Sequence, residues 1–276
     1  MQQESTITSN SPASKIERLR RTFGEIVAVE GLDLTIPSGL IYGLLGPNGA
    51  GKSTTIKMLT TILPPTSGTA FVAGYDIVSQ APVVRRKIGY VPQMLSADGA
   101  LSGFENLMLS AKLYGMERSE RKPRIETMLE LMGLTEASSR MVKTYSGGMI
   151  RRLELAQAML HHPSVLFLDE PTIGLDPVAR RSVWEKLQEL QQTYRTTILI
   201  TTHDMEEADE LCDELAIMHR GSLAVKGRPT DLKASIGNDA NLNDVFIHYS
   251  GASASLDEGG TFRDIRQTRN TARRLG

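Results

Sequence analysis

The segment 46–53 constrains the fold of this 276-residue chain more than any other feature, because its pattern requires a strand before it and a helix after it. It reads GPNGAGKS and matches GxxxxGK[ST], in which glycines let backbone N–H groups turn inward around phosphate oxygens. An apolar run, 40–45, precedes the segment, and residues 54–63 have the pattern of a helix that ends before Pro64. We therefore predict a strand, a phosphate-binding loop and a helix in direct succession.

This loop is the first candidate nucleotide site. Lys52 would reach the β- and γ-phosphates, the Ser53 hydroxyl would ligate Mg²⁺, and the positive end of the following helix would favour an anion. The alternative, a glycine-rich turn with a chance lysine, is disfavoured by the strand–loop–helix context. The residues expected to bind the nucleotide here are Gly46, Pro47, Asn48, Gly49, Ala50, Gly51, Lys52, Ser53 and Thr54.

Two adjacent acids follow the apolar run 165–168. Because a bare carboxylate is costly to bury, a strand that ends in Asp169 and Glu170 needs an explanation. Successive strand side chains point to opposite sides, so we expect the two acids to serve different places. Asp169 would approach Mg²⁺ directly or through water, and Glu170 would orient or deprotonate an attacking water. The alternative is a strand that runs into a solvated acidic turn, which the neighbouring phosphate loop disfavours.

Strand-like and helical segments alternate along the chain, which favours an α/β fold with a parallel sheet. Helical spacing dominates about 95–160 and indicates an inserted α-helical subdomain. We predict a disordered leader over 1–14, a folded domain over 15–236, and a C-terminal extension over 237–276. The end of that extension is rich in arginine and would either touch anionic lipid or a partner, or be solvated.

Composition excludes several functions. The formal net charge of −1 disfavours a chain-wide surface for nucleic acid. The single cysteine, Cys212, excludes an internal disulfide or a cysteine-based metal cage, and we expect it to pack in the interior. No apolar stretch approaches the roughly 18 residues that cross a bilayer, so any membrane part would come from another chain. The pair His161-His162 lacks a third metal ligand, and the acids of 204–214 indicate a solvated helix face rather than a calcium loop.

A second candidate anion site is formed by Ser146, Gly147 and Gly148 at the start of an expected helix. A chain that already holds a triphosphate needs no second site for the same phosphates. The simplest use is the γ-phosphate of a nucleotide on a partner chain, which predicts a head-to-tail dimer with two ATP molecules at the interface. As an isolated tetrapeptide, SGGM is more often a linker.

Taken in order, these motifs closely resemble the ATP-binding-cassette (ABC) family over about 16–236. The segment Tyr145 to Met149 is similar to the family signature LSGGQ, with Tyr145 and Met149 in place of leucine and glutamine. The resemblance implies a P-loop NTPase fold of the ABC type, an α/β nucleotide-binding domain with an inserted α-helical subdomain, and it implies ATP and Mg²⁺ as ligands.

The resemblance also implies roles for four further residues. Gln93 looks like the glutamine that contacts Mg²⁺ and couples to the membrane partner. Its alternative is a polar turn residue that follows a strand. His203 looks like the switch histidine that contacts the γ-phosphate, although a lone histidine at a strand end is usually structural. Asp176 looks like part of the D-loop that crosses the dimer interface. Phe23 aligns with the aromatic residue that stacks on adenine, and its alternative is core packing.

At the level of function, the chain looks like the ATP-hydrolysing subunit of a transporter in the drug-exporter branch of the daunorubicin-resistance type. The resemblance implies a homodimer or a pair with a paralogous ABC ATPase, and a separate integral-membrane permease of about six spans. The chain would lie at the cytoplasmic face of the membrane, and no nucleic acid is expected. The alternatives are a non-transport ABC ATPase acting on DNA or the ribosome, and a non-hydrolysing regulatory subunit.

Overall fold

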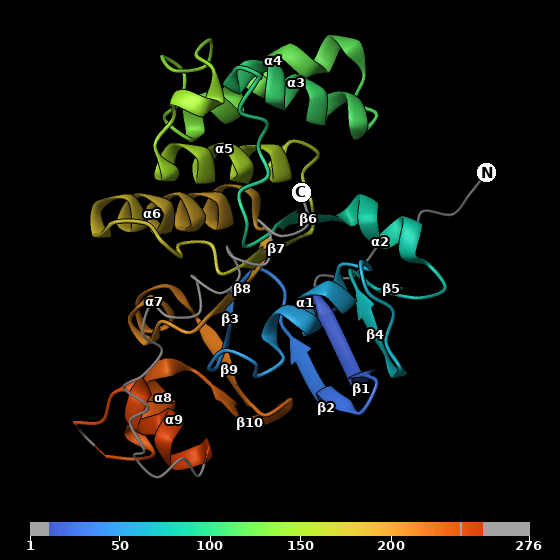
Figure 1. Cartoon of the computed structure of the whole chain (residues 1–276), viewed down its shortest axis with the longest axis vertical. Helices are drawn as coiled ribbons and strands as arrows, with labels where there is room; N and C mark the ends of the chain where they lie inside the picture. Colours follow the sequence, from blue (N-terminus) through green and yellow to red (C-terminus); the bar gives the residue numbers. More distant parts are fainter. Residues whose placement is uncertain (1–10, 238, 251–276) are drawn as a thin grey trace, which may run out of the picture.

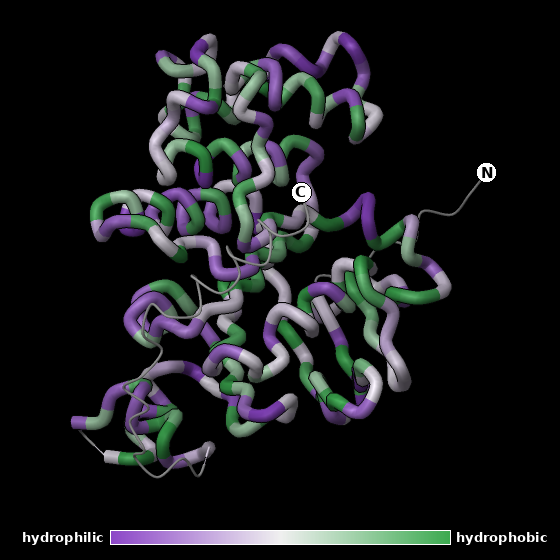
Figure 2. Tube along the Cα trace, in the orientation of Figure 1, coloured by the Kyte–Doolittle hydropathy of each residue, from purple (hydrophilic) through white to green (hydrophobic). Residues whose placement is uncertain are grey.

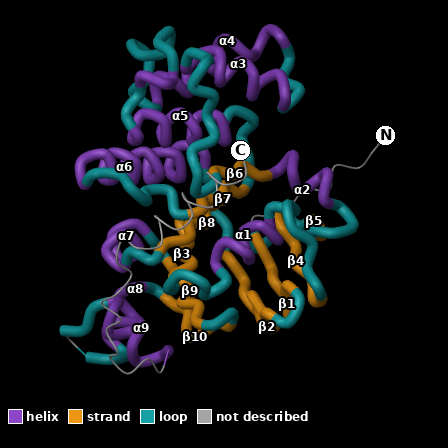
Figure 3. Tube along the Cα trace, viewed as in Figure 1, coloured by secondary structure: helices purple, strands orange, loops and turns teal. Residues whose placement is uncertain are grey.

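The computed structural model of this protein describes residues 11–237 and 239–250. Within them the strands form two sheets, and a group of helices lies at the end of the molecule away from the smaller sheet (Figure 1). Figure 3 shows this separation, with the strands together and the helical group apart. Within the described part of the chain, no helix is both long and apolar enough to cross a membrane.

The larger sheet has six strands in the order β10-β9-β3-β8-β7-β6 and is parallel except at β10, which pairs antiparallel with β9. Every residue of β3, β7 and β8 is buried, because elements cover both faces of a parallel sheet. The apolar stretches of β7 and β8 are accordingly hydrophobic in Figure 2. The strands are β3 (Ile41–Leu45), β6 (Ile88–Val91), β7 (Val165–Asp169), β8 (Thr197–Thr202), β9 (Glu214–His219) and β10 (Ser222–Gly227).

The smaller sheet is antiparallel, in the order β2-β1-β4-β5. Its strands are β1 (Ser14–Phe23), β2 (Ile26–Ile36), β4 (Ser67–Val72) and β5 (Tyr75–Asp76). Strand β2 carries one extra residue opposite Arg20, since Leu32 pairs with Leu19 and Val29 pairs with Arg21. The bulge leaves Ile26–Ile36 as one continuous strand.

The helices divide into those that flank the sheets and those of the inserted region. The first set is α1 (Lys52–Leu59), α2 (Ala81–Lys87), α6 (Pro177–Tyr194), α7 (Met205–Leu211), α8 (Pro229–Ala234) and α9 (Leu242–Ser250). The second set is α3 (Gly103–Leu113), α4 (Arg118–Leu131), the 3-10 turn Val142–Thr144 and α5 (Gly147–Met159). The second set lies within the predicted helical region, 95–160.

Alternate residues of the central strands point to two cores. In β7, Leu166 and Leu168 pack into a core with the helical set, whereas Val165 and Phe167 pack into a core with α1 and the smaller sheet. This period of two fixes which side of the larger sheet each layer covers. Ligands of open α/β sheets bind at the carboxyl ends of the strands, where the phosphate loop follows β3 and Glu170 follows β7.

Two predicted boundaries need correction. The leader was expected over 1–14, but Ala13 is buried and donates its N–H to the Ile36 carbonyl, and β1 begins at Ser14. Residues 1–10 lie outside the described residues. At the other end, the folded part continues past 236, since Leu242 and Val245 of α9 are buried in the helix-side core. The arginine-rich tail lies outside the described residues.

Candidate nucleotide site

The phosphate loop joins the end of β3 to the start of α1, as the sequence pattern predicts. Gly46 has a backbone φ of 151°, and a Cβ there would lie 2.3 Å from the Met218 carbonyl oxygen. Gly51 has a φ of 99°, and its Cβ would lie 2.5 Å from the Ala28 carbonyl oxygen. Only glycine fits these two positions, so the backbone N–H groups keep their turn toward the loop interior.

The remaining loop residues differ in exposure. Pro47, Asn48 and Gly49 form an exposed tip, and Ala50 is buried behind them. Ser53 and Thr54 are half-buried in the first turn of α1. The exposed tip and the helix start leave the expected phosphate position open to solvent while its floor is fixed by the core.

Lys52 is held under this loop. Its side chain is 4% exposed, and Nζ donates to the carbonyl oxygens of Gly46 at 2.7 Å and Pro47 at 3.1 Å. Nζ also lies 3.6 Å from Oε1 of Glu170. Burial lowers the pKa of Lys52, and the nearby Glu170 carboxylate opposes that shift. The Lys52 amine is therefore held between the phosphate loop and the Glu170 carboxylate.

Asp169 lies at the other side of the helix start. The Ser53 hydroxyl donates to its Oδ1 at 2.8 Å, and the Thr201 hydroxyl donates to the same oxygen at 2.6 Å. The carboxyl group is buried, with 3% of the residue exposed. Hydroxyl and carboxylate oxygens are the ligand types that Mg²⁺ takes beside substrate phosphates, so this pair of side chains fits the ion.

Glu170 is the centre of a second set of contacts. Its Oε1 lies 3.2 Å from Nδ1 of His203, and its Oε2 accepts from Nε2 of Gln93 at 3.3 Å. The residue is 6% exposed, whereas the His203 side chain is 46% exposed. Lys52 of α1 is the third residue whose side chain reaches this carboxylate, so three separate segments of the chain converge on it.

The two acids meet separate sets of partners, but alternation along a strand is not the reason. Strand β7 ends at Asp169, and Glu170 adopts a left-handed backbone with φ of 49°. Its N–H donates to the backbone and hydroxyl oxygens of Thr201, which hold this uncommon conformation. As a result both carboxylates contact residues of the loop that begins α1, Asp169 through Ser53 and Glu170 through Lys52.

The signature residues lie elsewhere, at the start of α5. Ser146 caps this helix, and its Oγ accepts from the Met149 N–H at 3.3 Å. Ser146 and Gly147 are exposed, whereas Gly148 is buried against α6, where an added Cβ would lie 2.9 Å from the Ala179 side chain. The two glycines thus allow the starts of α5 and α6 to approach closely.

Asp176 occupies the matching position on α6. Its side chain caps the helix by accepting from the Ala179 N–H at 2.9 Å, and it is exposed. Val178, in the same turn, is 81% exposed. In the described part of the chain, no hydrogen bond or ion pair joins Ser146 or Asp176 to the phosphate loop. The predicted site residues therefore form two separate groups.

Phe23 belongs to neither group. It ends β1, is 45% exposed and is absent from both described cores, so the alternative of core packing is wrong. The Arg21 guanidinium lies over the ring at 4.7 Å from its centroid. One face of the ring is therefore covered by a cation.

The sequence reading missed several polar residues that hold the site. Thr201 bonds Asp169, and Glu207 accepts from the Thr172 hydroxyl at 2.6 Å and from the Trp184 indole at 2.9 Å. Arg151 and Glu154 form a buried pair on α5. For Thr201 the available signal was a hydroxyl residue at the end of an otherwise apolar strand, whereas the Arg151–Glu154 pair gave no such signal.

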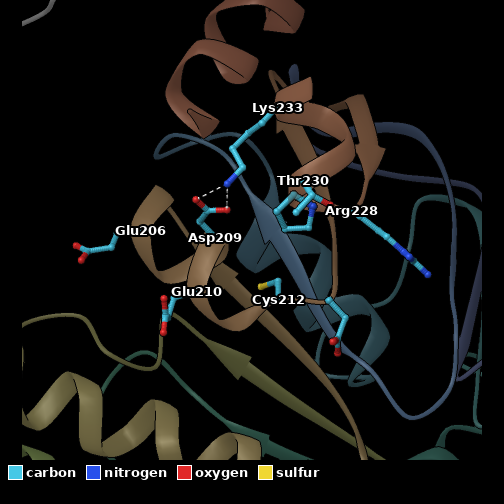
Figure 4. A pocket seen from close by; sticks show the side chains of 9 residues that line it. Glu206, Asp209, Glu210, Cys212, Arg228, Thr230 and Lys233 are labelled. Atoms are coloured by element: carbon cyan, nitrogen blue, oxygen red, sulfur yellow. Dashed lines mark hydrogen bonds and ion pairs between the residues drawn. The ribbon is translucent and has the colours of Figure 1, made fainter. Parts of the chain in front are cut away.

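A further cavity of about 410 Å³ lies between α7 and α8, away from the phosphate loop (Figure 4). Lys233 donates to both carboxylate oxygens of Asp209 across it, at 2.7 and 2.8 Å. Cys212 lines its wall, and burial raises the pKa of this thiol well above its usual value. In the described residues, no group of acids, histidines and cysteines could hold a metal ion. None of the predicted site residues lines this cavity.

Comparison with known proteins defines the class. Residues 29–173 match the family described as "ABC transporter". The daunorubicin/doxorubicin resistance ATP-binding protein DrrA of Streptomyces peucetius is 44% identical over 250 residues, which cover 91% of this chain and 75% of that protein. The linearmycin resistance ATP-binding protein LnrL of Bacillus subtilis (strain 168) is 38% identical over 238 residues, covering 84% and 76%.

A third relative and two solved structures are also parts of export or ABC transport systems. The Nod factor export ATP-binding protein I of Cupriavidus metallidurans is 40% identical over 226 residues, covering 82% of this chain and 74% of that protein. The structure of an ATP binding subunit of an ABC transporter aligns with a TM-score of 0.76 at 28% identity, covering 86% and 99%. The structure of cbiO1 from Clostridium perfringens, part of the complex cbiONQ, aligns at 0.75 and 28%, covering 81% and 91%.

The chain belongs to the ABC transporter family. It is an ATP-binding subunit and an ATPase of the transport type, not an ABC protein that acts on DNA or the ribosome. The fold class and the family predicted from the sequence are confirmed.

Proposed function

We propose that this subunit closes with a second cassette around two ATP molecules and thereby drives an export permease. The observation that carries the proposal is the convergence of Lys52, Gln93 and His203 on the buried carboxylate of Glu170. A carboxylate held in this way is placed to accept the proton of a water that attacks a phosphate. Hydrolysis would then let the pair of cassettes reopen.

Each residue of the phosphate-loop group has a role in this scheme. The loop N–H groups and Lys52 bind the phosphates, with Lys52 exchanging its contacts to loop carbonyls for phosphate oxygens. Ser53, Asp169 and Gln93 would hold Mg²⁺, which would neutralise charge on the phosphate oxygens. Glu170 takes the proton of the attacking water, and His203 orients Glu170 and contacts the γ-phosphate.

The second group serves the partner's nucleotide. Ser146 and Gly147 present a hydroxyl and helix N–H groups at an exposed helix start, and Asp176 lies beside them. A two-fold axis would bring Ser146 of each copy to the phosphate loop of the other. Phe23 stacks adenine on the ring face that Arg21 leaves open. The second cassette is another copy or a paralogue.

The relatives suggest the transport class. Two are named for resistance to daunorubicin, doxorubicin or linearmycin and one for Nod factor export. We therefore assign drugs, antibiotics, lipids or polysaccharides as the cargo class, carried by a separate permease of about six spans. The subunit would act at the cytoplasmic face of the membrane, attached through that permease.

The test is capture of the partner in its native membranes. A tagged Glu170→Gln chain is trapped with ATP, solubilised and identified with its bound proteins by mass spectrometry, beside a tagged Lys52→Ala chain that cannot hold ATP. A stoichiometric integral-membrane protein enriched only with Glu170→Gln supports the proposal. Capture without any membrane protein would overturn it.

A further inference from the structure

A charged pair is buried on α5, the helix that Ser146 caps. Arg151 Nη1 lies 3.0 Å from Oε2 of Glu154, and both side chains are 2% exposed. The mechanism above uses neither residue. A buried ion pair is weak as a source of stability, since an apolar pair of similar volume often serves as well. The pair therefore needs a function that an apolar pair would lack.

Arg151 holds the first half of the loop that carries Gln93. Its Nη1 donates to the Pro92 carbonyl oxygen at 2.8 Å, and its Nη2 donates to the Gln93 carbonyl oxygen at 3.0 Å. The planar guanidinium presents several donors in a fixed fork, which suits two successive carbonyl groups. One side chain of α5 thus fixes the backbone on both sides of the Pro92–Gln93 peptide bond.

Glu154 holds the second half of the same loop. Its Oε1 accepts from the backbone N–H groups of Ser96 and of Ala97, the latter at 3.3 Å, and from the Ser96 hydroxyl at 3.1 Å. Between the two anchors, Met94 is 82% exposed. The loop 92–97 is therefore fixed at both ends to one helix, with an apolar tip directed to solvent.

We propose that Arg151 and Glu154 are positioning residues that make the Gln93 loop and the Ser146 helix start move as one body. Gln93 reaches Glu170 of its own site, whereas Ser146 faces the partner's nucleotide; the inference rests on the proposed function in this respect. Arg151 is five positions after the cap Ser146, a distance of about 7.5 Å along the helix axis. Engagement of Ser146 would thus displace Gln93 and the exposed tip together.

The chemistry explains why the pair is charged. The loop offers two carbonyl acceptors to Arg151 and two N–H donors to Glu154, and buried backbone groups require partners. Two apolar residues would leave all four groups without those partners. The mutual ion pair at 3.0 Å then keeps each side chain aimed at its half of the loop.

The direct test measures loop mobility in the full chain. A nitroxide is attached to Met94→Cys in a Cys212→Ala background, which removes the chain's single other cysteine. Arg151→Met is expected to narrow the electron paramagnetic resonance lines, because the loop loses its first anchor. The matched control is Arg152→Met, since Arg152 lies next along α5 but donates to the Met132 carbonyl oxygen of the helical set at 2.8 Å. Parent-like lines in Arg151→Met would overturn the proposal.

A kinetic split completes the test. Arg151→Met is expected to lower kcat by about tenfold while the Kd for ATP stays at the parent value, because the phosphate loop and Phe23 are untouched. If that variant does not fold, Arg151→Lys replaces it, since one ammonium cannot bond both carbonyls in the same geometry. An unchanged kcat in the variant with narrowed lines would also contradict the proposal.

The proposed function fails in a distinguishable way. Glu170→Gln is measured beside these variants, and parent-like turnover in Glu170→Gln would remove the catalytic role while leaving the resonance result as it stands. The opposite result is also distinct. If Glu170→Gln loses turnover while Arg151→Met keeps the resonance lines and the kcat of the parent, only the positioning role of Arg151 is removed.

Discussion

The two groups of site residues differ in how complete they are within one chain. In the phosphate-loop group, Lys52, Ser53, Asp169 and Glu170 all bond one another or adjacent backbone, and the two carboxylates are buried. In the signature group, defined by Ser146, Gly147, Gly148 and Asp176, the side-chain hydrogen bonds only cap their own helices. Most of this second group is exposed.

This difference shows which part of the chemistry the fold organises by itself. Buried, mutually bonded charges keep their geometry before the substrate arrives, which is how electrostatic preorganisation works. An exposed helix start with free N–H groups offers a binding surface whose ligand comes from elsewhere. In the proposed function, the first group would be the reaction centre and the second would be half of an interface between two cassettes.

The largest expected effect on kcat comes from a substitution in the phosphate-loop group. Glu170→Gln keeps the side-chain size but removes the proton acceptor, so kcat should fall by at least about 100-fold while ATP still binds. Phosphate release in a single turnover and equilibrium nucleotide binding measure the two quantities. The control is Glu206→Gln, an exposed carboxylate on α7. Turnover at the parent rate would contradict the role of Glu170.

The next prediction tests whether the two groups act across chains. Lys52→Ala and Ser146→Ala chains should each be inactive alone, but a mixture should hydrolyse ATP, because a mixed pair keeps one site with both residues intact. The Ser146 variant also loses its helix cap, at a cost of about 1 kcal/mol, so its folding is checked by circular dichroism.

The matched control mixes Lys52→Ala with Glu170→Gln. Both changes lie in the phosphate-loop group, so every site of a mixed pair carries one of them and no activity should return. If two copies of this chain pair with one another, recovery in this mixture, or none in the first, would contradict the division into two groups.

A smaller effect on kcat is expected at the segment that joins the phosphate-loop group to the signature group. Thr172 lies between Glu170 and Asp176 in the sequence, and its hydroxyl donates to buried Glu207 of the helix that follows His203. Glu207→Leu should lower kcat less than Glu170→Gln does, because it displaces the catalytic residues without removing one. Glu207→Gln keeps an acceptor oxygen and should approach the parent.

Trp184 gives this prediction a spectroscopic readout. It is the single tryptophan of the chain, and its indole N–H donates to Glu207. Loss of that acceptor in Glu207→Leu should shift the emission to shorter wavelength, whereas Asp209→Asn on the same helix should not. Unchanged emission in Glu207→Leu would show that the contact does not persist in solution.

The phosphate loop was predictable because its chemistry is local. Glycines with positive φ, a lysine and a serine in fixed spacing determine the strand, turn and helix around them. The identities of Asp169 and Glu170 were also predictable from an apolar strand that ends in acids. Their relative direction was not, because the left-handed turn at Glu170 depends on Thr201, which lies on another strand.

The Arg151–Glu154 pair shows more clearly which features could not be predicted from the sequence. Charged residues three apart on a helix are usually solvated, and nothing within α5 tells that these two are buried. Their burial depends on loop 92–97, whose backbone supplies the partners from a distant part of the sequence. The burial of Ala13 was unpredictable for the same reason, because its backbone partner, Ile36, lies on β2, far along the chain.

The smallest expected effect lies outside both groups and concerns stability. Asp76 of β5 accepts from the N–H and hydroxyl groups of Ser79 and from the Thr69 hydroxyl. The Ser79 N–H is the main cause that lowers the pKa of Asp76 to about 2, from an ordinary 3.8. A carboxylate with a lowered pKa stabilises the fold above the unfolded-state pKa, and that contribution is lost as the pH falls from about 4 to about 2.

Asp76→Asn should therefore lower the free energy of unfolding at pH 6 by about 1 kcal/mol, less than the pKa shift alone implies because water screens this side chain. The difference from the parent should shrink as the pH is lowered below 4, as urea unfolding at several pH values can measure. The control is Glu25→Gln, in the exposed hairpin turn of the same sheet, which should unfold like the parent. Turnover should stay at the parent rate in both variants, because neither residue contacts the phosphate-loop group or the signature group. A fall in kcat in Asp76→Asn at unchanged stability would mean that β5 takes part in the reaction, and the site would then need a third group of residues beside the phosphate-loop and signature groups.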